Sequence, residues 1–159
     1  MGQKTEEKIL NLYYEFPERK FTVREISKLT NIPKSTVHKK LSNLNVLLEK
    51  NKSLFKIKKV NYFTEKLFEV GLIKFLIGEL NPSCIILFGS FRKGDSTKES
   101  DIDIFVESFV NKKLDLTKFE RKIGHKIDFF VESEINNLQE NLLNNVINGI
   151  KLFGSIRLK

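Results

Sequence analysis

Two short apolar runs enclose a polar segment in the middle of this chain, and they constrain its fold more than any other feature. Residues 84–88 form a continuous apolar run, and residues 102–106 form a second one interrupted by a single aspartate. Runs of this length that are rich in β-branched residues favour strands. Gly89 and Ser90 follow the first run directly, and Asp101 precedes the second. The sequence therefore predicts a small sheet from which a glycine-serine turn and acidic side chains emerge.

The acidic side chains stand two residues apart, at Asp101 and Asp103. Side chains at i and i+2 of a strand point to the same face, so these carboxylates are expected side by side. Two like charges so close are unfavourable unless a cation lies between them. Ligation by oxygen alone suits Mg²⁺ or Mn²⁺, which also bind the phosphates of a substrate. The missing Cβ of Gly89 and the hydroxyl of Ser90 then predict a turn that holds phosphate.

A third carboxylate, Asp128, interrupts a further strand-like run at residues 126–131. Burying an isolated carboxylate costs several kcal/mol, roughly, so this position predicts a partner for it. We expect a shared metal site, with the strand of Asp128 next to the strand of Asp101 and Asp103. A phosphate-holding turn and three carboxylates together indicate metal-dependent phosphoryl transfer.

This pattern of Gly89-Ser90 followed by Asp101-Ile102-Asp103 resembles the signature of the DNA polymerase β-like nucleotidyltransferases. The compact form over about residues 70–155 looks like the minimal nucleotidyltransferase group of prokaryotes. The resemblance implies that the turn binds the triphosphate of ATP or another NTP, that the aspartate pair holds two Mg²⁺ ions, and that Asp128 helps to activate an acceptor hydroxyl. Members of this group are partners of small helical HEPN toxins, which some of them inactivate by adenylylation.

The chain departs from the family pattern after the turn. Family members usually have Ala-Arg-Gly where this chain has Arg92-Lys93-Gly94. Lys93 keeps the positive charge of the usual arginine but lacks its bidentate fork. Arg92 replaces a small residue. Both are candidate phosphate-binding residues, and the departure implies rearranged phosphate contacts.

The first part of the chain predicts three helices, over residues 4–15, 23–29 and 34–44, followed by a hairpin. The hairpin is expected from apolar runs at 46–48 and 54–57. Thr22 and Glu25 have the spacing of a capping box at the start of the second helix. The order resembles a winged helix-turn-helix of transcriptional regulators, which implies DNA binding. The residues expected to contact DNA are Lys34, Ser35, Thr36, His38, Lys39, Asn43, Lys50 and Lys52.

Charge supports the same interpretation of this region. Residues 1–60 hold 14 Lys and Arg against 6 Asp and Glu, whereas residues 61–159 hold 14 of each, so the whole net charge of +8 lies in the first part. Basic clusters bind polyanions by displacing counterions. A solubilising lysine-rich surface, or a three-helix module that binds protein, would explain the same charge and pattern.

We therefore expect an α+β protein with a winged helix-turn-helix at 1–60, a connecting helix at 61–80 and a nucleotidyltransferase domain at 81–159. A helix over 134–147 and a short final strand are expected near the end of the domain. The single Cys84, the polar start of the chain and the absence of a long apolar run favour the cytoplasm and exclude a membrane span.

Three functions fit these observations. The leading one is a metal-dependent nucleotidyltransferase, such as an antitoxin that modifies a HEPN-type toxin and binds DNA as a homodimer. The second is a transcriptional regulator whose nucleotidyltransferase fold only senses nucleotide. The third, an antibiotic-modifying enzyme, is disfavoured by the small size of the chain.

Overall fold

The computed structural model describes the backbone of residues 2–50 and 52–158, and the side chains of residues 4–44 and 53–158. The chain divides into two compact units, Met1–Tyr62 and Phe63–Lys159. The boundary lies within one helix, α4 (Lys52–Glu69), which contributes residues to both units. In the described part of the chain, no helix combines the length and the apolar character needed to span a bilayer.

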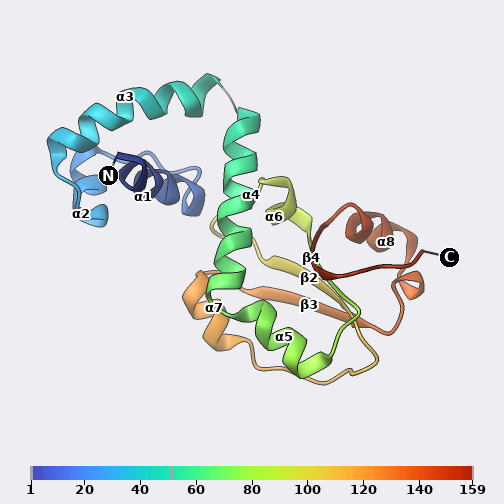
Figure 1. The fold of residues 1–159 in the computed structure, drawn as a ribbon. Coiled ribbons are helices and arrows are strands. Elements are labelled where there is room, and N and C mark those ends of the chain that lie inside the picture. The colour runs from blue at the N-terminus through green and yellow to red at the C-terminus, as the bar shows by residue number, and fades with distance from the viewer. Residues whose placement is uncertain (1, 51, 159) are drawn as a thin grey trace. The chain divides into compact units, whose positions relative to one another are not determined.

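The first unit is built on three helices, α1 (Gly2–Glu15), α2 (Val23–Thr30) and α3 (Lys34–Lys50) (Figure 1). The apolar positions of each helix recur every three to four residues, so each presents one stripe to a shared core. The buried side chains of this core include Ile9, Tyr14, Ile26, Val37 and Leu44.

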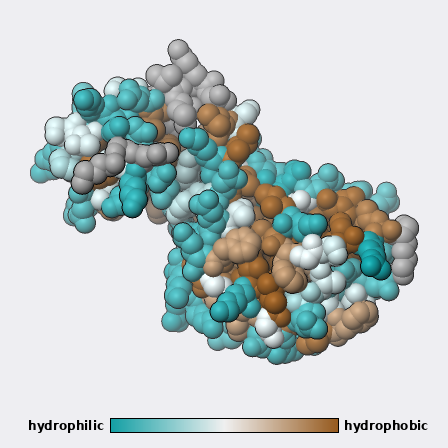
Figure 2. All heavy atoms as spheres, viewed as in Figure 1, coloured by the Kyte–Doolittle hydropathy of each residue, from teal (hydrophilic) through white to brown (hydrophobic). Residues whose placement is uncertain are grey.

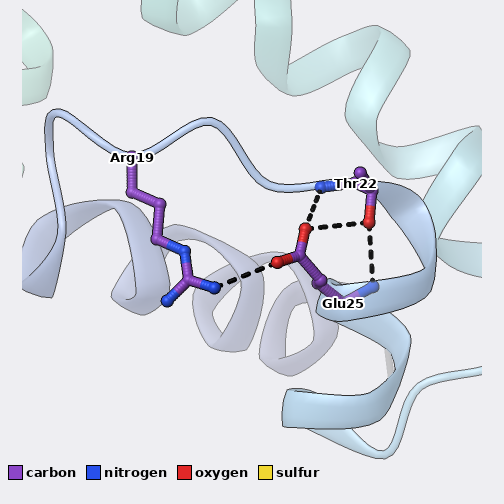
Figure 3. A network of polar contacts seen from close by, with 3 residues as sticks. All are labelled: Arg19, Thr22 and Glu25. Carbon is purple, nitrogen blue, oxygen red and sulfur yellow. Dashed lines mark hydrogen bonds and ion pairs between the residues drawn. The ribbon is translucent and has the colours of Figure 1, made fainter.

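A network of polar contacts fixes the start of α2, as Figure 3 shows. The backbone N–H of Glu25 donates to Thr22 Oγ1 at 3.2 Å, and the backbone N–H of Thr22 donates to Glu25 Oε2 at 2.8 Å. Arg19 adds an ion pair to Glu25 at 3.0 Å. Together these contacts, first the backbone hydrogen bond from Thr22, lower the pKa of Glu25 to about 2. The capping box predicted from the sequence is confirmed.

The predicted hairpin is wrong. Residues 46–48 belong to α3 and residues 54–57 to α4, so no wing forms there. Neither Gly nor Pro occurs between residues 45 and 60 to end a helix, and Lys and Glu in the expected turn are good helix formers. Lys50 ends α3 and Lys52 begins α4, and their side chains lie outside the described residues.

The single helix predicted over residues 61–80 is two helices. Helix α4 ends at Glu69 and α5 (Leu72–Leu80) follows. Gly71 separates them with a φ of +81°, a left-handed conformation that glycine adopts without a steric penalty. The other glycine of this stretch, Gly78, lies within α5 and does not interrupt it.

A four-stranded mixed sheet forms the centre of the second unit (Figure 1). Its strands are β1 (Cys84–Phe88), β2 (Ile102–Glu107), β3 (Ile127–Glu132) and β4 (Ile150–Gly154), in the order β3-β2-β1-β4. Strand β1 is antiparallel to β2 and β4, whereas β2 and β3 are parallel. The sheet and its helices make this unit α+β, as predicted.

One face of the sheet is covered by the segment before β4. The expected helix over 134–147 is a 3₁₀ turn, η1 (Ile135–Asn137), followed by α8 (Glu140–Ile147). Ile135 and Val146 pack on buried side chains of β1 and β2. Figure 2 shows hydrophobic residues gathered over this unit, whereas the visible face of the first unit is mostly hydrophilic.

Two further short helices were not expected from the sequence. Helix α6 (Gly89–Lys93) directly follows β1, at the predicted glycine-serine turn. Helix α7 (Thr117–Ile123) precedes β3 and buries Phe119 and Ile123. At only seven residues, α7 is too short to give a clear helical period.

Candidate active site

Gly89 and Asp103 meet at the end of β1. Phe88 and Asp103 are partners in the antiparallel register, and Gly89 follows with a φ of +68°. A Cβ atom on Gly89 would lie 1.9 Å from Oδ2 of Asp103. The carboxylate therefore occupies the space that any other residue would fill at position 89. The close approach of this turn to the acidic group is consistent with the prediction from the sequence.

The structure brings the second aspartate of the motif beside the third one. Asp103 pairs with Asp128 in the parallel register of β2 and β3, which confirms the predicted neighbouring strands. Asp101 lies one residue before β2. Burial raises the pKa of Asp103, and the negative charges of Asp128 and Asp101 raise it further. These three carboxylates therefore form one electrostatically connected group.

The exposure of these aspartates corrects one part of the expectation. Asp128 is exposed, and Asp103 is half-buried. Strand β3 is at the edge of the sheet, so it has a neighbouring strand on one side only. The argument that Asp128 needs a partner because it is buried is wrong. Its role depends on its position beside Asp103.

The donor chemistry of the group suits a hard divalent cation. Within the described ranges, no three His, Cys, Asp or Glu side chains converge into a ready metal site. Mg²⁺ is usually bound by one or two carboxylates, with phosphates and water as the other ligands. Burial raises the pKa of Asp103 most, and the charges of Asp128 and Asp101 raise it further, so a cation there would relieve the repulsion between the carboxylates. The residues therefore fit Mg²⁺ or Mn²⁺ that arrives with a nucleotide.

Hydrogen bonds join the segment before Asp101 to the segment before β3. The imidazole Nδ1 of His125 lies 2.9 Å from the carbonyl oxygen of Ser100. A carbonyl oxygen can only accept, so Nδ1 carries the proton in this contact. Lys98 Nζ donates to the carbonyl oxygen of Gly124 at 2.9 Å. Two hydrogen bonds thus join the residues before Asp101 to those before β3.

The sequence did not predict that His125 supports the site. Its ring is buried and meets Phe63 and Phe91 edge to face, with centroids 5.5 and 5.0 Å away. A histidine directly before a strand gave only a weak signal in the sequence. No pattern in the sequence indicated Lys98 or Ser100.

The other predicted phosphate-binding residues lie on α6. Ser90 and Arg92 are half-buried, and Lys93 is exposed in the last turn of the helix. All three lie within four residues of Gly89 in the chain. The structure thus keeps these three residues near the glycine turn.

The predicted DNA-contact residues with described side chains lie on α3, in the first unit. Val37 and Leu44 are buried and Leu41 is half-buried, so the helix turns its other face outward. Thr36 is half-buried on this helix. The exposed members of the set are Lys34, Ser35, His38, Lys39 and Asn43.

A glycine turn against a group of carboxylates at the end of a mixed sheet is the arrangement of a nucleotidyl-transfer site. Residues 72–152 match the family model of the nucleotidyltransferase domain. The chain therefore belongs to the nucleotidyltransferase domain family and is a nucleotidyltransferase enzyme.

Two proteins of Methanocaldococcus jannaschii, each named "putative protein adenylyltransferase", are similar to this chain. One is 38% identical over 71 residues, which is 40% of this chain and 71% of the relative. The other is 51% identical over 53 residues, which is 31% of this chain and 53% of the relative. The chain thus spans about half the length of this second relative. No solved structure matches the chain.

Proposed function

We propose that this enzyme transfers AMP from ATP, or the corresponding group from another NTP, to a hydroxyl group on a protein. The observation that carries the proposal is the half-buried Asp103 carboxylate, which lies against Gly89 and beside Asp128. This position suits a group that must hold the reacting phosphate through a cation. The names of the two relatives support a protein as the acceptor.

In the proposed reaction, the acceptor oxygen attacks the α-phosphorus as its proton leaves. The bond to the oxygen that bridges the α- and β-phosphates breaks, and pyrophosphate departs. Asp128 is exposed beside Asp103, so it can take the proton of the acceptor hydroxyl. Asp101 and Asp103 would hold Mg²⁺ or Mn²⁺, which supplies charge neutralisation on the phosphates. Gly89, Ser90, Arg92 and Lys93 would bind the triphosphate.

The transfer is tested with ATP labelled on the α-phosphate, Mg²⁺ and a lysate as the source of acceptors. Wild type should label protein, and Asp103→Asn should not. Glu99→Gln is a matched control because it removes one exposed negative charge two residues from Asp101. Equal labelling by wild type and Asp103→Asn would contradict the proposal.

A HEPN-type toxin is our proposed acceptor, from the resemblance to the minimal nucleotidyltransferase group. If the gene beside this one encodes a small helical protein, that protein is the one to purify and test. Label should appear on that protein with wild type, and its toxicity in cells should fall when wild type, but not Asp103→Asn, is co-expressed. Unchanged toxicity with wild type would rule out this acceptor.

We propose DNA as the partner of the first unit, bound through the exposed face of α3 in a helix-turn-helix without a wing. The concentration of net charge in residues 1–60 supports a polyanion partner. Binding as a homodimer would place two such helices on adjacent half-sites. Gel shifts on the upstream region of its own operon should weaken steeply with salt and with Lys39→Glu. The control is Lys8→Glu, an equal charge change on an exposed residue of α1.

The alternative is a DNA-binding regulator that senses nucleotide without transferring it. The departure at Arg92 and Lys93 from the family pattern supports this alternative, because it alters the residues that would hold the triphosphate during transfer. Tight nucleotide binding by wild type with no labelled product, and nucleotide-dependent DNA affinity, would support the sensor over the transferase.

A further inference from the structure

The outer edge of β3 offers backbone groups for pairing. The N–H of Ile102 donates to the carbonyl oxygen of Lys126, and the N–H of Ser108 donates to that of Glu132, both at 2.8 Å. In a parallel ladder, alternate residues face the same neighbour. The even-numbered residues of β3 therefore face β2. The residues that turn their N–H and C=O groups outward are Ile127, Phe129 and Val131.

Only the first of these outward groups has a visible partner in the described part of the chain. The N–H of Ile127 donates to Glu120 Oε1 at 3.0 Å. Among the described residues, none hydrogen-bonds to the outward groups of Phe129 or Val131, although both residues are half-buried. Partly buried backbone groups are stabilised when they find hydrogen-bond partners. The last four residues of β3 therefore present an open pairing edge beside Asp128.

A groove of about 1100 Å³ runs along this edge and includes every residue of β3 in its lining. Residues 111–117, in the connection from β2 to α7, form one wall. Leu138 and Leu142 form the other. Asp128 is part of the same lining, so the proposed proton acceptor opens into the groove. The groove is thus continuous with the candidate active site.

We infer that the acceptor enters this groove as an extended polypeptide segment that adds a strand to the free edge of β3. The inference rests on the proposed transfer and specifies how the acceptor is held. Main-chain hydrogen bonds to Phe129 and Val131 would fix the segment, and alternate side chains would lie on the face of Asp128. The hydroxyl of one such side chain would thereby be presented to the carboxylate group.

The charge of the groove favours a polypeptide over a nucleic acid. Four acidic side chains, Asp115, Glu120, Asp128 and Glu132, line it against two lysines, Lys112 and Lys113. One of these lysines, Lys112, is already paired with Glu79 at 2.5 Å. A nucleic-acid backbone would be repelled by this excess of negative charge. A segment with Lys or Arg near its hydroxyl residue would be attracted. Only a polypeptide supplies backbone N–H and C=O groups with the spacing of a β-strand.

The inference is tested with pools of ten-residue peptides that carry one central Tyr, Ser or Thr and basic flanking residues. Label from α-labelled ATP is followed with the wild-type protein and Mg²⁺. Two further pools carry N-methyl groups on alternate backbone nitrogens, one pool for each alternation counted from the hydroxyl residue. Only one alternation faces β3 in an added strand. Labelling should fall at least about tenfold in that pool, since each lost hydrogen bond weakens binding, and should persist in the other.

A protein variant tests the same edge independently. Val131→Pro removes an outward N–H without removing a donor to β2, so peptide labelling should fall at least about tenfold. A melting curve establishes whether this variant folds, and if it does not, the methylated pools decide alone because they leave the protein unchanged.

Equal labelling of the two methylated pools would overturn the inference. So would labelling of oligonucleotides, or of free tyrosine, as fast as the peptides. If wild type labels no acceptor at all, or labels as Asp103→Asn does, the proposed transfer itself fails. Failure of the groove and failure of the reaction are thereby distinguished.

Discussion

Asp103 lies half-buried against Gly89, with two further carboxylates nearby. Its pKa in the folded chain is raised above the ordinary 3.8, first by burial and then by Asp128 and Asp101. A carboxyl with a raised pKa destabilises the fold when it is charged. The folded state is therefore favoured by this group at low pH, and that contribution is lost as the pH rises through the raised pKa.

Asp103→Asn should for this reason lose activity and gain stability. We expect transfer to fall at least about 100-fold, since a metal ligand contributes several kcal/mol to the transition state. The melting temperature should exceed that of wild type at pH 7, and the difference should shrink as the pH falls below the raised pKa. Calorimetry across pH measures both effects. A variant less stable than wild type at pH 7 would show that the carboxylate makes compensating contacts.

Gly89→Ala should damage both fold and chemistry. The added Cβ would lie only 1.9 Å from Asp103 Oδ2, so the carboxylate would have to move. The φ of +68° costs an alanine a further 1 kcal/mol or more, roughly. Gly78→Ala is a matched control, because it has no atom within 4 Å of the new Cβ and lies in α5. That control should be neutral or stabilising by up to about 1 kcal/mol. Denaturant titration of both variants measures the contrast.

At the scale of elements, the start of α2 depends on an exposed but well-bonded carboxylate. The pKa of Glu25 is lowered to about 2, against an ordinary value of 4.5. Its stabilising contribution is therefore complete above pH 4.5 and is lost as the pH falls towards 2. The protection factors of the α2 amides in wild type, which are corrected for the intrinsic pH dependence of exchange, should fall over that window.

Glu25→Gln should exchange faster than wild type at pH 6 and lose this pH dependence. Glu18→Gln, an exposed residue before the helix, is the control and should behave as wild type. Identical exchange rates in Glu25→Gln and wild type would mean that the Thr22 hydroxyl alone supports the cap.

His125, in the turn before β3, should influence the rate of transfer because it holds the segment that carries Asp101. His125→Phe keeps an aromatic ring between Phe63 and Phe91 but removes the donor to the Ser100 carbonyl. We expect kcat to fall about tenfold with little change in KM for ATP, because Asp101 follows Ser100 directly. His125→Asn, which can still donate, should recover part of kcat. A change confined to the melting temperature would assign His125 to packing alone.

The sequence predicted most of the strands, because each is a short apolar run with clear ends. It also predicted that Asp128 lies beside Asp103, although the burial argument behind that prediction was wrong because Asp128 is exposed. It did not predict the exposure of Asp128. Whether a strand lies at the edge or the centre of a sheet depends on the strand order, and no local sequence pattern predicts that β3 is an edge strand.

The prediction of a hairpin was wrong for a different reason. The apolar residues 46–48 fit a strand in isolation, but they also continue the helical spacing of Val37, Leu41 and Leu44. A short apolar run is ambiguous between the two periods, and the surrounding helix formers decided the outcome. The family match covers residues 72–152, so it gives no guidance on this region.

At the scale of the whole molecule, the net positive charge and the proposed catalytic residues belong to different units. The net positive charge lies in the first unit's residues, whereas the carboxylate group lies in the second. Lys39→Glu should therefore weaken the proposed DNA binding steeply and leave AMP transfer within about twofold of wild type, because α3 holds no site residue for transfer. Asp103→Asn should do the reverse. Gel shifts and labelling on the same preparations measure this, and coupled loss in both variants would indicate that the units act together.

The unpaired side of β3 also has a consequence for handling the protein in solution. A sheet edge that accepts one foreign strand accepts a strand from another copy, which is the first step of many aggregates. Glu120 blocks only the beginning of the strand, and the excess of acidic side chains along the groove repels a second copy mainly at low salt. Concentrated, salt-rich samples should therefore precipitate first through this strand, and a bound acceptor peptide should keep them clear.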